Sequence, residues 1–363
     1  MSAPRHLPPP ALPGSYLVLE LTNRCSLACV HCSVSDDSHP HHQQTGYLDP
    51  LLADALFDDL ARTGARFDTL ILFWLGEPLI HPHFSRIWRA ALRLAATHQT
   101  FSKVEVHTNA THLNARRTDA ALNSAGVRQV WHFSLDAIDR DTYLKVKGRD
   151  RFDQVQDNIA HFLHRKAERG ARWPRPVLQY IVGSNNADTV PAFRRHWEGV
   201  LRAAGLPFRV AAGHVPGGED AVIFFRQLDC PTPEIQQREN AIFRAAMDAQ
   251  GLSLPPQAAK GEVVAAENLS ACSGFWKSPV ISWRGEVTTC TRDNLLDNGL
   301  GSLADAPFSA LWWGEEMRAR RGRVSCGDYG GLDLCATCFI PRSLNHTEVS
   351  EDDIARTAAW EAP

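Results

Sequence analysis

Three cysteines in one short loop constrain this chain more than any other feature of its sequence. Cys25, Cys29 and Cys32 have C-x3-C-x2-C spacing and directly follow the strand-like run Tyr16 to Leu21. Cysteine thiolates are soft ligands, and a site with four protein ligands is closed, whereas a catalytic site keeps one position open. The loop therefore indicates a metal centre with one open position. The alternative is three buried cysteines that act as small hydrophobic residues.

Length, charge and hydrophobic content limit the class of protein. The 363 residues, 44% of them hydrophobic, suffice for one large domain or two ordinary ones. The formal net charge is -3 and the longest basic run is Arg318 to Arg321, so we expect no binding to nucleic acid. Neither a signal peptide nor a run of about 18 apolar residues is present. We therefore predict a cytoplasmic protein without membrane contact, whose nine cysteines are metal ligands or reactive thiols.

Strand-like and helix-like segments alternate along the first two thirds of the chain, which predicts an α/β fold with a parallel sheet and right-handed crossovers. The predicted helices between the strands include 84–96, 115–125, 152–167 and 190–204. The six predicted strands are 16–21, 67–74, 103–107, 129–133, 177–182 and 208–211.

The cysteine loop after a first strand resembles the signature of the radical SAM superfamily, whose fold is a partial (β/α)6 TIM-like barrel. This resemblance implies a 4Fe-4S cluster on Cys25, Cys29 and Cys32. It also implies that S-adenosylmethionine (SAM) chelates the open iron through its amino and carboxylate groups. His31 occupies the position at which the family has an aromatic or planar side chain against the adenine of SAM.

Two short motifs extend the resemblance at the ends of predicted strands, where such barrels have their active sites. Leu75-Gly76-Glu77-Pro78 resembles the GGEP motif, which implies that Gly76, Glu77 and Pro78 hold the SAM ammonium group. An ordinary strand-to-helix turn is the alternative. Thr108 and Asn109, followed by Ala110, resemble the TNG segment near the SAM ribose.

Two further matches involve charged side chains. Ser134 and Asp136 end the fourth predicted strand, and the resemblance implies that they bond to the SAM ribose and carboxylate. Lys147-Gly148-x-x-x-Phe152 resembles R-G-x-x-x-F, whose arginine pairs with the SAM carboxylate. Lysine supplies the same charge without the two-pronged geometry of arginine.

A second group of cysteines lies near the C-terminus. A predicted hairpin turns at Gly285, and the whole segment resembles the twitch domain, a short relative of the SPASM domain. The resemblance implies an auxiliary 4Fe-4S cluster, and the alternative is a four-cysteine structural zinc site. The ligands, in C-x17-C-x44-C-x2-C spacing, are Cys272, Cys290, Cys335 and Cys338.

Two cysteines, Cys230 and Cys326, remain outside both groups. We predict hydrogen abstraction from a C–H bond, followed most readily by epimerisation, in which a thiol such as Cys326 returns a hydrogen atom. The alternative is a twitch-type dehydrogenase, similar to the aminocyclitol dehydrogenase of this group, that oxidises a secondary alcohol to a ketone. Structural burial of both thiols, or Cys326 as an auxiliary ligand, is equally open.

The expected substrate is a small carbohydrate or aminocyclitol from antibiotic-type secondary metabolism, because the first strand begins within about fifteen residues of Met1 and leaves no room for a leader-binding domain. Trp74, Trp276, Trp283, Trp312 and Trp313 suit stacking on a sugar ring, although buried core aromatics explain them as well. A peptide-modifying enzyme and a non-catalytic iron–sulfur electron-transfer protein are the alternatives. Flavodoxin or ferredoxin is the expected reductant.

The predicted organisation has five parts. They are a Pro-rich extension (1–14), a radical SAM partial barrel (15–212), a linker with one helix (213–270), a twitch-type domain (271–345) and a C-terminal tail (346–363).

Overall fold

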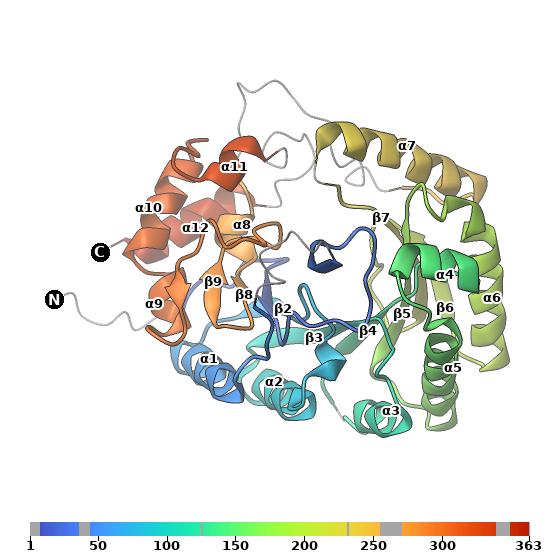
Figure 1. Ribbon diagram of the computed structural model, residues 1–363. Helices are drawn as coiled ribbons and strands as arrows, with labels where there is room; N and C mark the ends of the chain where they lie inside the picture. The colour runs from blue at the N-terminus through green and yellow to red at the C-terminus, as the bar shows by residue number, and fades with distance from the viewer. Residues whose placement is uncertain are drawn as a thin grey trace. The chain divides into compact units, whose positions relative to one another are not determined.

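The structure is a computed structural model that describes residues 8–35, 44–124, 126–230, 232–254, 271–338 and 349–362 (Figure 1). The chain divides into two compact units, each described here by itself. The first unit comprises 1–23, 44–104 and 263–363, and the second comprises 24–43 and 105–262. None of the helices in the described part of the chain has both the length and the apolar composition to cross a lipid bilayer.

In the first unit, β1 lies between β2 and β8 and is parallel to both. The strands β8, β9 and β10 continue from it in antiparallel order, so the predicted hairpin around Gly285 is confirmed. The elements are β1 (Tyr16–Leu19), α1 (Pro50–Thr63), β2 (Phe67–Leu72), η3 (Pro78–Ile80), α2 (Phe84–His98), the start of β3 (Phe101–Thr108), α8 (Gly274–Lys277), β8 (Val280–Ile281), β9 (Glu286–Thr288), β10 (Gly301–Ser302), α9 (Phe308–Trp312), α10 (Glu315–Val324), α11 (Asp333–Thr337) and α12 (Glu351–Glu361).

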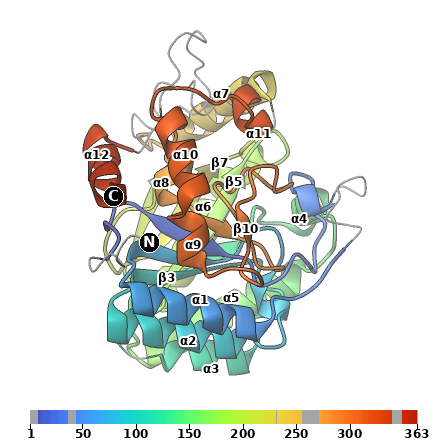
Figure 2. The ribbon, with the colours of Figure 1, turned by 90° about the vertical axis from the view of Figure 1, so that its left-hand side faces the viewer.

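Local sequence signals define the first crossover helix, α1. Asp49 caps its N-terminus through a 2.9 Å bond from the backbone N–H of Leu51, and Gly64 ends it in the left-handed conformation that glycine favours. The helices α1 and α2 lie side by side, as Figures 1 and 2 show. Buried aromatic side chains of α9, Phe308 and Trp312, stack in the same unit.

The second unit is built on a parallel sheet in the order β4-β5-β7-β6, to which β3 leads from the first unit. Its elements are η1 (Ser33–Ser35), the end of β3, α3 (Ala115–Leu122), β4 (Gln129–Ser134), α4 (Arg140–Lys147), α5 (Phe152–Glu168), β5 (Arg175–Val182), η4 (Ala187–Thr189), α6 (Val190–Ala203), β6 (Phe208–Ala212), β7 (Ala221–Gln227) and α7 (Pro233–Ala249).

Strand β7 corrects the sequence prediction. Its residues fall in the stretch that we assigned to a linker, yet they pair with β5 from Val177 to Val182 and separate that strand from β6. The apolar run from Ala221 to Phe225 is buried, which explains why it forms a strand despite the glycine-rich turn before it. The helix that we predicted within the linker is confirmed as α7.

Aromatic residues fill the core between the second unit's sheet and its helices. Trp131 and Phe133 of β4 pack on Phe162 of α5, and Tyr180 of β5 packs on Phe193 of α6. Because successive side chains of a strand point to opposite faces, the residues between these aromatics point to the other face of the sheet. That other face carries the polar residues described below.

Candidate functional site

The loop with the first three cysteines is bound to the end of α4. The backbone N–H groups of Ala28 and Val30 donate to the carbonyl oxygens of Lys147 and Val146, each at 3.0 Å. Gly148 ends α4 with a φ of 70°, and a Cβ atom there would lie 2.2 Å from the carbonyl oxygen of Ala28. Glycine is therefore required at this position, which gives a structural reason for its presence in the motif.

The three thiols of this loop suit an iron–sulfur cluster with one open position. Cys25, Cys29 and Cys32 form no disulfide bonds, and each is partly accessible. Burial raises the pKa of Cys29, which the Lys147 ammonium group counteracts. The side-chain amide of Asn109 donates to the sulfur of Cys25 at 3.5 Å. Three cysteine sulfurs with one open position match the donor set that iron–sulfur clusters use.

Asp136 and Lys147, both predicted contacts of SAM, bond to each other. The ammonium group of Lys147 lies 2.5 Å from Oδ2 of Asp136, and both side chains are buried. Burial lowers the pKa of Lys147, but the charge of Asp136 outweighs it, so the pKa is raised overall. The other oxygen of Asp136 accepts a 2.6 Å bond from the backbone N–H of Ile181. The two charges of the pair act on Cys29 in opposite directions, since Lys147 lowers and Asp136 raises the pKa of its thiol.

His31 lines a cavity of about 220 Å³ in the second unit. Burial lowers the pKa of His31, so its imidazole is neutral at neutral pH. The walls include Val146 of α4, Ile181 and Asn186 at the end of β5 and in the turn after it, and Leu228 after β7. A neutral planar ring in a cavity lined by both apolar and polar side chains is suitable for stacking on a nucleobase, and the role predicted for His31 stays a prediction.

The segment after β3 turns sharply toward the cysteine loop. Ala110, which replaces the glycine of the family motif, has a φ of 61°, in the region that glycine favours. The hydroxyl of Thr108 accepts a 2.9 Å bond from the backbone N–H of Ala110, and the amide oxygen of Asn109 accepts from Thr111. Ser134 receives a 3.3 Å bond from the side chain of Gln179.

Glu77 lies in the first unit and is buried. Its carboxylate accepts a 2.9 Å bond from the backbone N–H of Leu79 and so caps η3, which begins at Pro78. Gly76 precedes it in the turn after β2. A buried carboxylate at the end of a strand is suitable for binding a cationic group, the role predicted for Glu77.

The four C-terminal cysteines gather in the first unit. Burial raises the pKa of Cys290 to about 11 and that of Cys335 to about 12. The pKa of Cys272 is raised further by burial and by repulsion from the other three thiols, including Cys338. Asn298 donates its side-chain amide to the sulfur of Cys335 at 3.2 Å. These thiols form one site, since each affects the charge of the others.

The spacing of these thiols favours a cluster over a zinc ion. Zinc, with bonds of about 2.3 Å to sulfur, brings its ligands to about 3.8 Å from one another. Among the described residues, the one group of three or more His, Cys, Asp or Glu side chains with all ligand atoms within 4.8 Å is Glu105, His107 and His132. The four thiols are therefore more widely spaced than one zinc ion requires.

The two remaining cysteines differ in accessibility. Cys326 is exposed, in the turn that follows α10. Cys230 is buried after β7, and its backbone N–H donates to the side chain of Gln236 at 2.9 Å. Of the two thiols, only that of Cys326 is accessible to another molecule.

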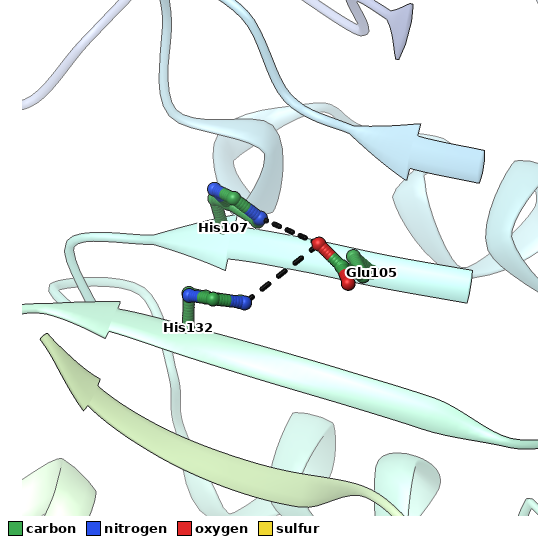
Figure 3. A group of neighbouring side chains, drawn as sticks. All are labelled: Glu105, His107 and His132. Atoms are coloured by element: carbon green, nitrogen blue, oxygen red, sulfur yellow. Dashed lines mark hydrogen bonds and ion pairs between the residues drawn. The ribbon is translucent and has the colours of Figure 1, made fainter. Parts of the chain in front are cut away.

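Two polar groups were missed by the sequence analysis. Glu20 follows β1, is fully buried and accepts bonds from the backbone N–H groups of Leu75 at 3.4 Å and Trp283 at 3.0 Å. Burial raises the pKa of Glu20 to about 7. The second group is Glu105 with His107 and His132 (Figure 3). The alternation of β3, in which Glu105 and His107 flank the buried Val106, was the signal that could have found part of it.

Comparison with known protein families matches two parts of the chain. Residues 19–170 match the radical SAM superfamily, and residues 272–339 match the SPASM iron–sulfur cluster-binding domain. Both matches contain the cysteines expected in them. The cofactors of these domains are SAM with a 4Fe-4S cluster and auxiliary iron–sulfur clusters, as predicted.

Individual proteins also have sequences similar to this chain. The chain is 33% identical over 148 residues to the GTP 3',8-cyclase of Chlorobaculum tepidum, and the alignment covers 41% of each chain. It is 24% identical over 286 residues to the tungsten-containing aldehyde ferredoxin oxidoreductase cofactor-modifying protein of Pyrococcus furiosus, covering 76% of this chain and 71% of that protein. The chain thus spans about two fifths of the length of the first of these relatives.

A solved structure confirms the fold class. The structure of anSMEcpe with bound AdoMet and Cp18Cys peptide has a TM-score of 0.56, with 13% sequence identity, and covers 97% of this chain and 96% of that chain. The predicted fold, a partial TIM-like barrel followed by a smaller cluster domain, is therefore correct. This chain therefore carries a radical SAM domain and, C-terminal to it, an iron–sulfur cluster-binding domain of the SPASM/twitch type.

Proposed function

We propose that this radical SAM enzyme oxidises a secondary alcohol of a small polyhydroxylated molecule, a carbohydrate or an aminocyclitol, to a ketone. This oxidation removes one hydrogen atom from the carbon, one proton from the hydroxyl group and one electron from the resulting radical. SAM, when bound, supplies a radical that removes the hydrogen atom. The electron needs an acceptor within the protein or a partner.

The site formed by the four C-terminal cysteines carries this proposal. Cys272, Cys290, Cys335 and Cys338 supply four thiolates, which would close an auxiliary 4Fe-4S cluster completely. A closed cluster offers no iron to a substrate and is suited to electron transfer. Oxidation of the substrate leaves one electron that an acceptor must take up, whereas epimerisation is redox-neutral. This site therefore favours the dehydrogenase over the epimerase that we predicted from the sequence.

Residues of the second unit would bind the first cluster and SAM. Cys25, Cys29 and Cys32 would hold the first cluster, and His31 would lie against the adenine of SAM. The ammonium group of Lys147, fixed by Asp136, would act on the SAM carboxylate through its charge, since one of its bonds is already made to Asp136.

Further cofactor contacts would come from the strand ends. Glu77, with Gly76 and Pro78, would hold the SAM ammonium group, and Thr108, Asn109 and Ser134 would contact the ribose. A small acidic electron carrier of the flavodoxin or ferredoxin class would reduce the first cluster.

A polar sheet face supports a polyhydroxylated substrate. Beside Glu105, His107 and His132, the same face of the second unit carries Ser134 and Gln179. Several hydrogen-bonding groups on one face suit a substrate with several hydroxyl groups. The tryptophans carry less weight, because Trp276 and Trp312 are buried in the first unit and belong to its core.

Epimerisation remains the second candidate. The observation that favours it is the exposed thiol of Cys326, a group that can donate a hydrogen atom. Cys230 is buried and is therefore the weaker choice.

Mass spectrometry of anaerobic reactions tests the proposal. The reconstituted and reduced enzyme is incubated with SAM and a panel of myo-inositol, amino-substituted deoxyinositols, sugar nucleotides and short cysteine- or serine-containing peptides. We expect a product about two mass units lighter than one of the cyclitols or sugars. An isomer of unchanged mass would indicate the epimerase, and a modified peptide would place the enzyme among peptide-modifying members.

A further inference from the structure

Glu105, His107 and His132 form a cluster on the face of the second unit's sheet that points away from α5. Val104 and Val106 alternate with Glu105 and His107 on β3, and His132 lies between two β4 aromatics that pack on α5. Alternation along the strands therefore directs all three polar side chains to the opposite face, where Figure 3 shows them converging.

The distances show how closely these groups interact. Oε2 of Glu105 lies 3.2 Å from Nε2 of His107 and 3.7 Å from Nε2 of His132. The two imidazole rings are stacked, with centroids 4.1 Å apart and planes inclined by 28°. One carboxylate oxygen therefore interacts with two adjacent imidazole rings in a partly buried environment.

The ring geometry argues against a metal site, although two histidines and one glutamate are suitable ligands for zinc or iron. A metal ion binds an imidazole nitrogen within the plane of the ring. Stacked rings direct their nitrogen lone pairs nearly parallel to each other, so one ion cannot lie in both planes. Metal binding would require one ring to rotate out of the stack.

The hydrogen bond defines the protonation of His107. A carboxylate only accepts hydrogen bonds, so Nε2 of His107 carries the proton that is donated to Glu105. Nδ1 is then the basic nitrogen of the neutral ring. If Nδ1 takes up a proton, the negative charge of Glu105 stabilises the resulting imidazolium.

The cluster lies close to the predicted SAM site along the chain. His107 precedes Asn109 by two residues on the same strand end, and the amide of Asn109 contacts the sulfur of Cys25. Two residues of a strand span about 6.6 Å. The side chain of His107 is 14% exposed and that of His132 is 7% exposed, so His107 is the better placed to meet another molecule.

We infer that His107, oriented by Glu105, is the base that accepts the hydroxyl proton of the substrate during its oxidation. The inference rests on the proposed function, because oxidation of the alcohol releases a proton that a base must accept. The C–H bond breaks with the hydrogen atom leaving to the SAM-derived radical, and the O–H bond breaks with its proton going to Nδ1 of His107. The remaining electron goes to the auxiliary cluster, and the carbon and oxygen form the ketone.

A chemical-rescue experiment tests this assignment with the reconstituted enzyme and the panel compound that it oxidises, deuterated at the reacting carbon. His107→Ala should lower ketone formation about 100-fold, the range that general bases contribute. Deuterium should still appear in 5'-deoxyadenosine. Added imidazole should restore ketone formation at least about tenfold, which a purely structural defect would not allow. Glu105→Gln should shift the pH profile of ketone formation.

The control is His164→Ala, an exposed histidine of α5 in the same unit, which should behave as the wild type. A wild-type rate of ketone formation in His107→Ala would overturn the assignment and leave the proposed function intact. A wild-type enzyme that forms no ketone from any compound overturns both. One zinc or extra iron bound per wild-type chain, and lost in His107→Ala, would show that His107 is a metal ligand and not the base.

Discussion

The carbonyl oxygen of Ala28 occupies the space in which Gly148 would carry a side chain, at 2.2 Å from an added Cβ atom. This contact joins the loop of the first cluster to the end of α4. The consequence is that the cysteine loop and the motif containing Lys147 form one structural element.

Gly148→Ala should disturb the first cluster selectively. The substitution adds a clash with backbone to the strain of a positive φ, which together cost at least about 2 kcal/mol. We expect reconstituted protein to lose iron from the first site and to keep the auxiliary cluster, as measured by iron analysis and EPR. Gly170→Ala is the control, because Gly170 also has a positive φ, of 57°, but no atom lies within 4 Å of its added Cβ. Equal iron in both variants would disprove the role of the contact.

Lys147→Met should destabilise the protein by about 3–5 kcal/mol, because it leaves the buried carboxylate of Asp136 without its cation. Thermal unfolding followed by circular dichroism measures the loss. The double variant Asp136→Asn/Lys147→Met should recover part of it. Lys145→Met, at an exposed position of the same helix, is the control. A similar small effect in both single variants would show that the pair is not energetically important.

Glu20 should make stability depend on pH. Its pKa is raised from 4.5 to about 7 in the folded protein, so the folded state binds the proton more tightly than the unfolded state. The stabilisation is complete below pH 4.5 and is lost as the pH rises through about 7, with a total of about 3 kcal/mol. Wild-type protein should therefore lose more thermal stability between pH 5 and pH 8 than Glu20→Gln. Parallel pH curves for the two proteins would show that Glu20 keeps an ordinary pKa.

At each predicted cluster site a side-chain amide donates a hydrogen bond to a cysteine sulfur, from Asn109 to Cys25 and from Asn298 to Cys335. Such bonds stabilise the more negative, reduced form of a cluster. Asn109→Leu should make the reduction potential of the first cluster more negative, and Asn298→Leu should do so for the auxiliary cluster. Potentiometric EPR titration distinguishes the two. A shift of the other cluster in either variant would mean that the assignment of ligands is incorrect.

Sequence patterns predicted the order of most strands and helices, because local alternation and periodicity report burial. They did not predict that β7 inserts between β5 and β6, since strand pairing depends on contacts distant in the sequence. The cysteines were found because their spacing is itself the signal. The ion pair between Asp136 and Lys147 was not predicted, because the sequences of two separate motifs do not show that their side chains meet in the fold.

The cluster of Glu105, His107 and His132 illustrates the same limit. Glu105 and His107 share a face by strand alternation, but His132 comes from the next strand and only the fold brings it within 4.1 Å of the other ring. Glu20 likewise looked like a strand-end residue, and its raised pKa results from burial that the sequence does not show.

We propose that substrate oxidation delivers its electron to the auxiliary cluster. This electron transfer can be followed in a single-turnover reaction in heavy water that is frozen for EPR and then analysed by mass spectrometry. We expect one ketone to form for each auxiliary cluster reduced, with the product about two mass units lighter than the substrate. An isomer carrying one deuterium from solvent, with the auxiliary cluster still oxidised, would contradict this proposal and establish epimerisation.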